Sequence, residues 1–519
     1  MSSKPQYYLA IDSGTQSIRC AIIDDKGNFV DIEQIHIEPC YSPQKGYAEQ
    51  KAKYFWEMLC KSSKTLLERQ NELKHQIVGV SVSCQRNVVI NLDKDGNPLR
   101  PAIHWLDQRK AKMDLPLPSP IKWGLKALGI YGLVESTYRD SEYNWLRQNQ
   151  SEILEKTHKM LFLSGFYHYK FTGKFVESKA NVVGYVPYDY KKHAWYSEKN
   201  LFRRLSNIPL SMLPELVNPG EIIGEITELA SMQTGIPKGL PFVSGATDKA
   251  SEVLGCGVVK SDSVACISLG TTSSVQTVSE KYQEVIPFMP LYPSAISGKF
   301  NSEVTVLKGF WMVTWFKEEF SHQERELART QNIPAELLLD KFLTDIPAGS
   351  HGLITQPYWE TTGFSFPGPE AKGAFVGFCD AHKRPHLYKS IIEGLAYGLR
   401  EGLEKTQNKL GKKISVLRIA GGGSQSDNIM QIMADVFGIP TERPHSFQAT
   451  LLGCAIGMAV TLGRYKDHSE AVENMVRIQR RFEPIPKNVE VYQKLYTRIY
   501  LKMYKQLKPL YKEIAEIGG

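Results

Sequence analysis

The stretch YYLAIDSGTQSIRCAII, residues 7–23, decides the fold that we expect. Two apolar, β-prone runs, residues 7–11 and 18–23, flank a turn at residues 12–17, which predicts a β-hairpin. A second hairpin is predicted from residue 263, with the turn Gly270-Thr271-Thr272-Ser273 between its strands. Because both turns have the pattern Gly-Thr-x-Ser, the chain contains an internal repeat that indicates two related domains.

The remaining pattern alternates strands with helices, which is typical of an α/β protein. Leucine and isoleucine recur every fourth residue from Leu387 to Leu403, which predicts one long helix. The tail from Val489 onward is amphipathic, and we interpret it as an outer, solvated helix. Further strands are expected at residues 30–37, 77–82, 88–92, 241–244 and 416–420, and further helices at residues 54–73, 424–437 and 449–462.

Bulk composition excludes several classes of protein. The 519 residues predict two large domains, and 42% hydrophobic with 23% charged residues is typical of globular chains. The net charge of +8 comes from scattered lysines, so we expect no nucleic-acid partner. No apolar run is long enough to span a membrane, and no signal-peptide pattern is visible. The eight dispersed cysteines form no CxxC pair, which predicts reduced thiols, no zinc site and a cytoplasmic location.

The two hairpins provide the chemistry of a phosphate site, although the common GxxxxGK[ST] and GxGxxG loops are absent. Glycine lets the backbone approach a phosphate, and successive N–H groups and Thr or Ser hydroxyls donate hydrogen bonds to it. Asp12 is placed to hold Mg²⁺ through water, and Arg19 to neutralise phosphate charge. An ordinary structural hairpin is the alternative for either copy alone. The third glycine loop, residues 421–423, favours a bound nucleotide.

Asp248 is the candidate general base. It lies in Gly245-Ala246-Thr247-Asp248-Lys249-Ala250, directly after a predicted buried strand and at a helix start. A carboxylate there can accept the proton of a substrate hydroxyl during phosphoryl transfer. A simple N-cap is the alternative.

Seven motifs, in this order, resemble those of the FGGY carbohydrate kinases, within the actin-like ATPase superfamily. They are IDSGTQSIR (11–19), RPAIHWLDQR (100–109), GATDKA (245–250), GVV (257–259), SLGTTS (268–273), KGAFVG (372–377) and GGGS (421–424). The resemblance implies two ribonuclease H-like domains with ATP and Mg²⁺ in the cleft between them. Residues 1–255 would carry the acceptor site and the first hairpin, and residues 256–519 the nucleotide site and a C-terminal helical extension.

The same resemblance implies roles for single residues. Asp248 matches the catalytic base and Asp12 the metal-associated aspartate. The positions that match the acceptor site are Gln85, Arg86, Asn87, Trp105 and Asp107, with Lys249 beside the base. Those that match the ATP site are Gly14, Thr15, Gln16, Ser17, Arg19, Gly270, Thr271, Thr272, Gly422, Gly423 and Ser426.

Departures from the family pattern concern the acceptor. Glycerol kinases would read Gln-Arg-Glu at residues 85–87 and typical xylulose kinases Gln-Met-His, whereas this chain reads Gln-Arg-Asn. Lys249 stands where Gln or Asn is usual, and it either reaches an anionic or carbonyl-bearing acceptor or is a surface lysine beside a cap.

The expected activity is ATP-dependent phosphorylation of a small sugar or polyol. A ketopentose of the xylulose or ribulose type is the first acceptor class, and glycerol is the alternative. A catalytically silent sugar sensor and an ATP-driven switch or chaperone are the alternatives from other classes. Homodimers are frequent in the family, so a homodimer is the assembly that the resemblance implies.

Overall fold

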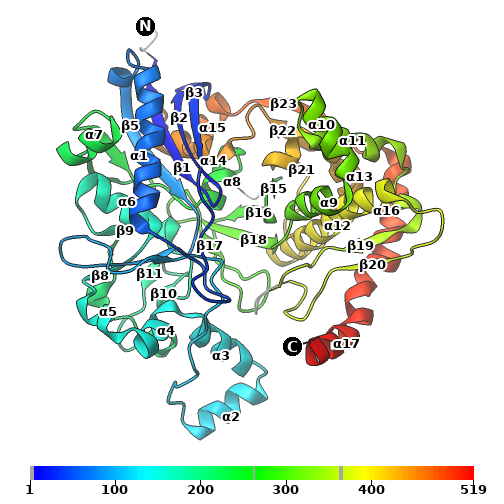
Figure 1. Cartoon of the computed structure of the whole chain (residues 1–519), viewed down its shortest axis with the longest axis horizontal. Helices are drawn as coiled ribbons and strands as arrows, with labels where there is room; N and C mark the ends of the chain where they lie inside the picture. The colour runs from blue at the N-terminus through cyan, green and yellow to red at the C-terminus, as the bar shows by residue number, and fades with distance from the viewer. Residues whose placement is uncertain (1–4, 261–262, 362–365, 519) are drawn as a thin grey trace. The chain divides into compact units, whose positions relative to one another are not determined.

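A computed structural model describes residues 5–260, 263–361 and 366–518. The chain divides into two compact units (Figure 1). Unit 1 comprises Met1–Val259, Tyr292–Phe300 and Thr450–Val476, and unit 2 comprises Lys260–Leu291, Asn301–Ala449 and Arg477–Gly519. None of the described helices is both long enough and apolar enough to cross a membrane.

Unit 1 is built on a six-stranded sheet in the order β13-β14-β5-β1-β2-β3. The predicted first hairpin is confirmed, since β1 and β2 pair antiparallel, and β5 and β14 then extend the sheet in parallel. The bounds are β1 Tyr7–Ser13, β2 Ser17–Asp24, β3 Phe29–His36, β5 Ile77–Cys84, β13 Ile222–Glu225 and β14 Pro241–Val243.

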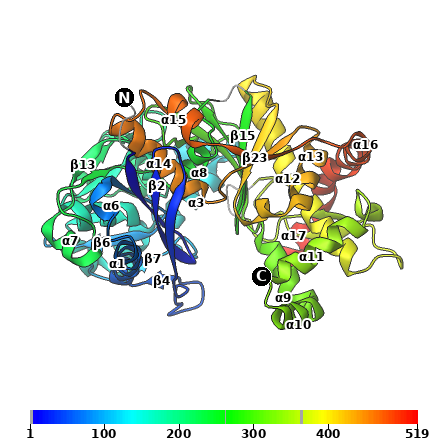
Figure 2. The same cartoon turned by 90° about the horizontal axis from the view of Figure 1, so that it is seen from above.

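Both faces of this sheet are covered by helices, which explains why β1 is apolar at nearly every position. Leu9 and Ile11 pack with α1, whereas Tyr8 and Ala10 pack with α14 on the opposite face (Figure 2). The helices of unit 1 that carry these cores are α1 Ala52–Arg69, α6 Leu163–Thr172, α7 Glu228–Thr234, α8 Asp248–Gly255, α14 Ala449–Thr461 and α15 His468–Met475.

A smaller part of unit 1 carries the 85–105 region. It contains a four-stranded sheet in the order β4-β7-β6-β8. Its strands are β4 Glu49–Gln50, β6 Val89–Leu92, β7 Ala102–Ile103 and β8 Lys159–Phe162, with the ladders β9 Val176–Ser178 to β12 Glu215–Val217 and β10 Tyr188–Asp189 to β11 Ala194–Trp195. Its helices are α2 Ser119–Ala127, α3 Tyr131–Asp140, α4 Glu142–Asn149 and α5 Ser151–Lys156.

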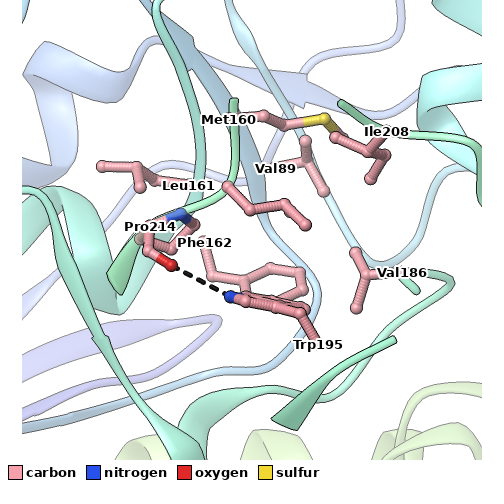
Figure 3. A pocket seen from close by; sticks show the side chains of 9 residues that line it. Val89, Met160, Leu161, Phe162, Val186, Trp195, Ile208 and Pro214 are labelled. Atoms are coloured by element: carbon pink, nitrogen blue, oxygen red, sulfur yellow. Dashed lines mark hydrogen bonds between the residues drawn. The ribbon is translucent and has the colours of Figure 1, made fainter. Parts of the chain in front are cut away.

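An apolar cavity lies inside this part, lined by side chains that include Val89, Phe162 and Trp195 (Figure 3). The indole nitrogen of Trp195 donates a hydrogen bond of 2.9 Å to the carbonyl oxygen of Pro214. The volume of about 10 Å³ is barely enough for one water molecule. We therefore regard it as a packing gap and not as a sugar site.

Unit 2 repeats the sheet of unit 1. Its strands β23-β22-β21-β15-β16-β18 follow the order β13-β14-β5-β1-β2-β3, and the first four pairings have the same sense: antiparallel, parallel, parallel, antiparallel. The internal repeat predicted from the two hairpins is confirmed. The bounds are β15 Val264–Leu269, β16 Ser273–Ser279, β18 Phe300–Val306, β21 Val416–Ala420, β22 Thr441–Pro444 and β23 Ile478–Phe482, with β19 Ile354–Gln356 pairing with β20 Ala374–Val376.

The long helix predicted from the leucine spacing is α12, Arg384–Leu410, and its Ile391, Leu395 and Leu399 are fully buried. The other helices of unit 2 are α9 Trp311–Phe320, α10 His322–Gln331, α11 Ala335–Asp345, α13 Asp427–Phe437, α16 Pro486–Leu495 and α17 Leu501–Gly518. A π-helix, Tyr496–Tyr500, joins α16 to α17.

The C-terminal helices are not merely solvated, so that interpretation of the sequence is wrong. Tyr492, Tyr496 and Tyr500 are buried in the core of unit 2, where they pack around Tyr397 of α12. The tyrosines recur every fourth residue, so one face of the tail completes a core while the lysines stay outside.

Candidate active site

The first hairpin brings Asp12 and Arg19 together. They are opposite each other in the β1–β2 register, and Arg19 Nη1 lies 3.6 Å from Asp12 Oδ2. Burial raises the pKa of Asp12 to about 6, and Arg19 opposes that shift. The other oxygen, Oδ1, is buried with no hydrogen-bond partner among the described residues. Asp12 is therefore a carboxylate with one buried oxygen still to be satisfied.

Gln85 connects this hairpin to the 104–105 loop. Its Oε1 accepts hydrogen bonds from Thr15 Oγ1 at 3.0 Å and from Trp105 Nε1 at 3.2 Å, and it lies 2.9 Å from His104 Nε2. Its Nε2 donates to the carbonyl oxygen of Gly14 at 3.3 Å. Gln85 follows β5, so the parallel pairing of β5 with β1 sets it beside the turn.

The turn itself is closed by a hydrogen bond from the Gly14 amide to the carbonyl oxygen of Ser17, at 3.0 Å. Gln16, at its tip, is exposed. Ser17 Oγ accepts from Arg19 Nε at 3.3 Å. The hairpin thus presents its tip to solvent while its two strands hold the polar side chains in place.

Asp248 is the first residue of α8, and residues 244–247 separate it from the end of β14 at Val243. Thr247 is the N-cap, because its side chain accepts from the Ala250 amide; the N-cap alternative for Asp248 is wrong. The Asp248 side chain is 33% exposed, its Oδ1 accepts from the Lys249 amide at 2.8 Å, and Arg86 Nε lies 3.8 Å away. Partial burial raises the pKa of Asp248, whereas Arg86 and Lys249 lower it.

Lys249 is half-buried beside Asp248. Its Nζ lies 3.3 Å from Glu252 Oε2, and its side chain is 17% exposed, so it is not a freely solvated surface lysine. Glu252 is a neighbour that sequence reasoning missed. The i,i+3 spacing of a Lys and a Glu at a helix start is the signal that could have identified it.

Arg86 and Asn87 complete this region of unit 1. The Arg86 guanidinium lies over the ring of Tyr292, 5.1 Å from the ring centroid. Asn87 has a positive φ of 49° and donates from Nδ2 to Glu142 Oε1 at 2.9 Å. Glu142, on α4, was not among the residues predicted from sequence, and no spacing pattern connects it to Asn87.

Both carboxylate oxygens of Asp107 are occupied by contacts within unit 1. Its two carboxylate oxygens accept hydrogen bonds from Arg109 and from the Ala48 amide, and its side chain is almost fully buried. Trp105, by contrast, is exposed, and its indole N–H is shared between Gln85 and Thr15. Of the two, Trp105 is the one whose surface is open to a ligand.

The second hairpin, in unit 2, has a similar turn. The Thr271 side chain is exposed, and Thr272 Oγ1 donates to the carbonyl oxygen of Leu307 at 2.9 Å. The carbonyl oxygen of Gly270 accepts from the Phe310 amide at 3.0 Å. These contacts fix the turn and leave Thr271 exposed.

The glycine loop after β21 needs glycine for two different reasons. Gly421 has a φ of +85°, and a Cβ there would lie 2.7 Å from the carbonyl oxygen of Leu269. A Cβ on Gly423 would lie 2.4 Å from the ring of Phe310. Gly422 is exposed and faces open space. The loop therefore packs closely on β15 and leaves Gly422 exposed.

Ser426 is the N-cap of α13. Its Oγ accepts from the Ile429 amide at 3.1 Å and donates to Asp340, which also accepts from Asn428 Nδ2 at 2.7 Å. Its hydroxyl is thus engaged within unit 2, and Asp340 is a partner that the sequence did not reveal. Among the described residues, no group of three or more His, Cys, Asp or Glu side chains is arranged to hold a metal ion.

Comparisons with known proteins identify the family. The models of the FGGY family of carbohydrate kinases match residues 7–255 as the N-terminal domain and residues 265–462 as the C-terminal domain. A protein named uncharacterized sugar kinase YgcE, from Escherichia coli K12, is 30% identical over 518 residues, covering 100% of this chain and 96% of its own. A xylulose kinase of Lactococcus lactis is 26% identical, covering 99% of both chains.

Solved structures share the fold. The gluconate kinase and the ligand-bound xylulose kinase of Lactobacillus acidophilus each have a TM-score of 0.81 and 22% identity, covering 98% of this chain and 100% and 99% of their own. The two-domain actin-like ATPase fold predicted from sequence is confirmed by these neighbours and by the repeated sheets. The chain therefore belongs to the FGGY family of carbohydrate kinases and is an ATP-dependent sugar kinase.

Proposed function

We propose that the enzyme phosphorylates a hydroxyl group of a ketopentose of the xylulose or ribulose type, with Asp248 as general base. The observation that carries this proposal is the Asp248 carboxylate, which is partly exposed at the start of α8 and within 3.8 Å of the Arg86 guanidinium. A carboxylate that lies beside a cation and is partly open to a ligand has the properties that a base for a sugar hydroxyl requires.

In the proposed reaction the substrate hydroxyl oxygen bonds to the γ-phosphorus of ATP, the bond from that phosphorus to the bridging oxygen breaks, and ADP leaves. The hydroxyl proton passes to Asp248. Oδ1 already accepts from the Lys249 amide, so Oδ2 is the oxygen that we assign to this proton. Arg86 and Lys249 favour the ionised form of Asp248 that the first step needs.

ATP binding is assigned to the two hairpins and the glycine loop, each within its own unit. In unit 1 the residues are Gly14, Thr15, Gln16, Ser17 and Arg19, and in unit 2 they are Gly270, Thr271, Thr272, Gly422, Gly423 and Ser426. Asp12 would hold Mg²⁺, which supplies positive charge to the phosphates when bound. Its buried, unsatisfied Oδ1 fits that role, because Mg²⁺ prefers carboxylate oxygen and commonly keeps several waters.

The acceptor class follows from the 85–87 segment. Arg86 offers a fixed fork of donors that suits vicinal hydroxyls, and Asn87 offers both a donor and an acceptor where a carboxylate would only accept. Lys249 places a half-buried ammonium group beside the base, although this group also forms an ion pair with Glu252. The xylulose kinases among the relatives support a ketopentose, while a glycerol kinase of Thermococcus gammatolerans, 28% identical over 493 residues, keeps glycerol as the second candidate.

We also propose that residues 1–255 supply the acceptor site and the first phosphate hairpin, and that residues 256–519 supply the rest of the nucleotide site and a C-terminal helical extension. A cytoplasmic location is favoured by the eight cysteines, none of which forms a disulfide in the described structure.

An ADP-release assay tests the proposed function. The purified enzyme is given ATP and Mg²⁺ with D-xylulose, D-ribulose, glycerol and D-gluconate in turn. We expect the highest kcat/KM with a ketopentose. Turnover of glycerol alone would support the second candidate, and preference for gluconate would contradict the acceptor class. If calorimetry shows sugar binding while no acceptor releases ADP, the protein is a sensor and the proposal is wrong.

A further inference from the structure

Asn87 has a backbone conformation that is unfavourable unless neighbouring contacts stabilise it. It follows β5 and precedes β6, with a positive φ of 49° in the left-handed region. Asparagine tolerates this region better than most residues, but the conformation remains costly unless neighbouring contacts fix it. The contact that the structure provides is the hydrogen bond from Nδ2 to Glu142 Oε1, at 2.9 Å.

This contact leaves one polar atom of each partner unsatisfied. Asn87 Oδ1 and Glu142 Oε2 are both buried and have no hydrogen-bond partner among the described residues. Two acceptor oxygens cannot bond to each other, so an ionised Glu142 offers nothing to the amide oxygen. A carboxylic acid can, because its O–H donates to Oδ1 while its other oxygen still accepts from Nδ2. One proton on Glu142 Oε2 would then give both of these atoms a hydrogen-bond partner.

We propose that Glu142, as a neutral carboxylic acid, positions Asn87 in the acceptor site through this two-bond pair. The proposal rests on the proposed function, which places Asn87 against the acceptor. Glu142 is a positioning residue and acts only through Asn87. Gly184 packs on the same amide oxygen: a Cβ there would lie 2.4 Å from Asn87 Oδ1, so the amide is confined from that side as well.

The surroundings of Glu142 favour the neutral form. Its side chain lies at the start of α4 and is buried, which raises its pKa to about 7. The carboxylates that face it, Asp107 from the 104–109 loop and Asp140 from the end of α3, raise the pKa further, and Tyr185 lies near as an uncharged phenol. The Asn87 amide and the backbone at the start of α4 oppose this shift but do not reverse it.

A pH dependence of acceptor binding follows. Above neutral pH Glu142 loses its proton, the second hydrogen bond is lost, and the amide of Asn87 is no longer fixed. The acceptor KM of the wild type should then rise roughly tenfold between pH 6 and pH 8.5, as expected for one lost hydrogen bond at a buried site. The KM for ATP should not follow this change, because in the first phosphate hairpin Thr15 donates to Gln85 and Arg19 to Ser17, whereas Asn87 donates to Glu142.

The Glu142→Gln variant separates positioning from mere packing. A glutamine amide accepts from Nδ2 and donates to Oδ1 at every pH, so its acceptor KM should stay near the low-pH wild-type value throughout. Glu142→Ala should show a high acceptor KM at every pH. Glu401→Gln is the matched control, because burial also raises the pKa of Glu401 to about 7, but it lies on α12 in unit 2. Glu401→Gln should keep the wild-type pH profile.

Thermal unfolding provides a readout that does not depend on activity. Folding raises the pKa of Glu142 from 4.5 to about 7, so the unfolded chain loses this proton first as pH rises. The wild type should therefore lose stability relative to Glu142→Gln between about pH 4.5 and 7, with no further loss above that interval.

The outcomes are distinguishable. A stability difference between the wild type and Glu142→Gln that does not change with pH would overturn the acid–amide pair. A stability difference of the expected sign with a pH-independent acceptor KM, or a Glu142→Gln KM that still rises with pH, would overturn the positioning role. Absence of any acceptor turnover would contradict the proposed function itself, whereas the stability arm would still decide the state of Glu142.

Discussion

At the scale of single residues, Asp248 is subject to two opposing influences. Burial favours its neutral form, whereas Arg86 and Lys249 favour the carboxylate. We expect Asp248→Asn to keep ATP binding and to lower acceptor-dependent kcat by roughly 10²–10⁴, the contribution of a positioned general base. Steady-state ADP release and calorimetry with ATP measure the two effects. A near-normal kcat would remove Asp248 from the role.

Asp12 is predicted to serve catalysis and not stability. It is buried, its pKa is raised to about 6, and one of its oxygens has no partner among the described residues. Such a group costs folding energy, so Asp12→Ala should lose Mg²⁺-dependent activity severely while thermal unfolding stays near the wild-type temperature or shifts upward. A collapse of the thermal transition in parallel with activity would show that the carboxylate is structural.

Asn87 is the residue through which acceptor choice should be altered. A carboxylate at position 87 would resemble the glycerol kinase pattern, but it would also stand beside Glu142, and two neighbouring carboxyl groups resist ionisation together. We therefore expect the preference for glycerol to increase when Asn87→Glu is combined with Glu142→Gln. The ratio of kcat/KM for glycerol to that for a ketopentose should rise at least about tenfold, equal to roughly 1.4 kcal/mol of discrimination.

Arg86→Ala is the companion variant for the acceptor site. It removes donors from every acceptor alike, so it should raise KM for all of them and leave KM for ATP nearly unchanged. If both the double variant and Arg86→Ala change only stability and leave selectivity intact, the 85–87 segment is packing and the acceptor site lies elsewhere.

At the scale of elements, sequence periodicity was informative wherever one physical cause dominated. The hairpins were predictable because apolar strands end in turns of small polar residues, and α12 because its leucines recur every fourth residue. Ser426 and Asp107 show the limit. Both match site positions of the family, yet their polar atoms are engaged by Asp340 and by the Ala48 amide, which are distant in sequence. Contacts between residues distant in sequence carry no periodicity, so a single sequence cannot reveal them.

The C-terminal helices illustrate the same limit and allow a test. Tyr500 is 4% exposed, it stacks on Tyr496, and its hydroxyl is hydrogen-bonded to that of Tyr358 at 3.1 Å. Tyr500→Ala should cost about 3–5 kcal/mol of stability, as for other large aromatic side chains removed from a core. Ile499→Ala, at the exposed neighbouring position, should cost about 0.5 kcal/mol or less. Equal effects in denaturant unfolding would restore the solvated interpretation.

At the scale of the whole molecule, the chain does not complete unit 1 before it builds unit 2. Helices α14 and α15 come after most of unit 2 in sequence but belong to unit 1. They form one of its cores with Tyr8, Ala10 and Val243, which are fully or almost fully buried. One face of the unit 1 sheet therefore stays uncovered until the chain has passed through most of unit 2 and returned.

This threading predicts that residues 1–259 cannot fold alone. The fragment lacks Leu451, Leu452, Ile456, Met458 and Met475, which are all fully buried in that core. Burying one such side chain is worth about 1.5–3 kcal/mol, so the five together contribute on the order of 10 kcal/mol, as much as the whole stability of a typical domain.

We expect the isolated fragment to aggregate or to show no cooperative thermal transition, whereas a fusion that adds residues 449–476 through a flexible linker should unfold cooperatively. A fusion that carries Leu452→Asp and Ile456→Asp is the matched control and should behave like the bare fragment. Cooperative unfolding of residues 1–259 by themselves would show that the returning helices only decorate a sheet that is already stable.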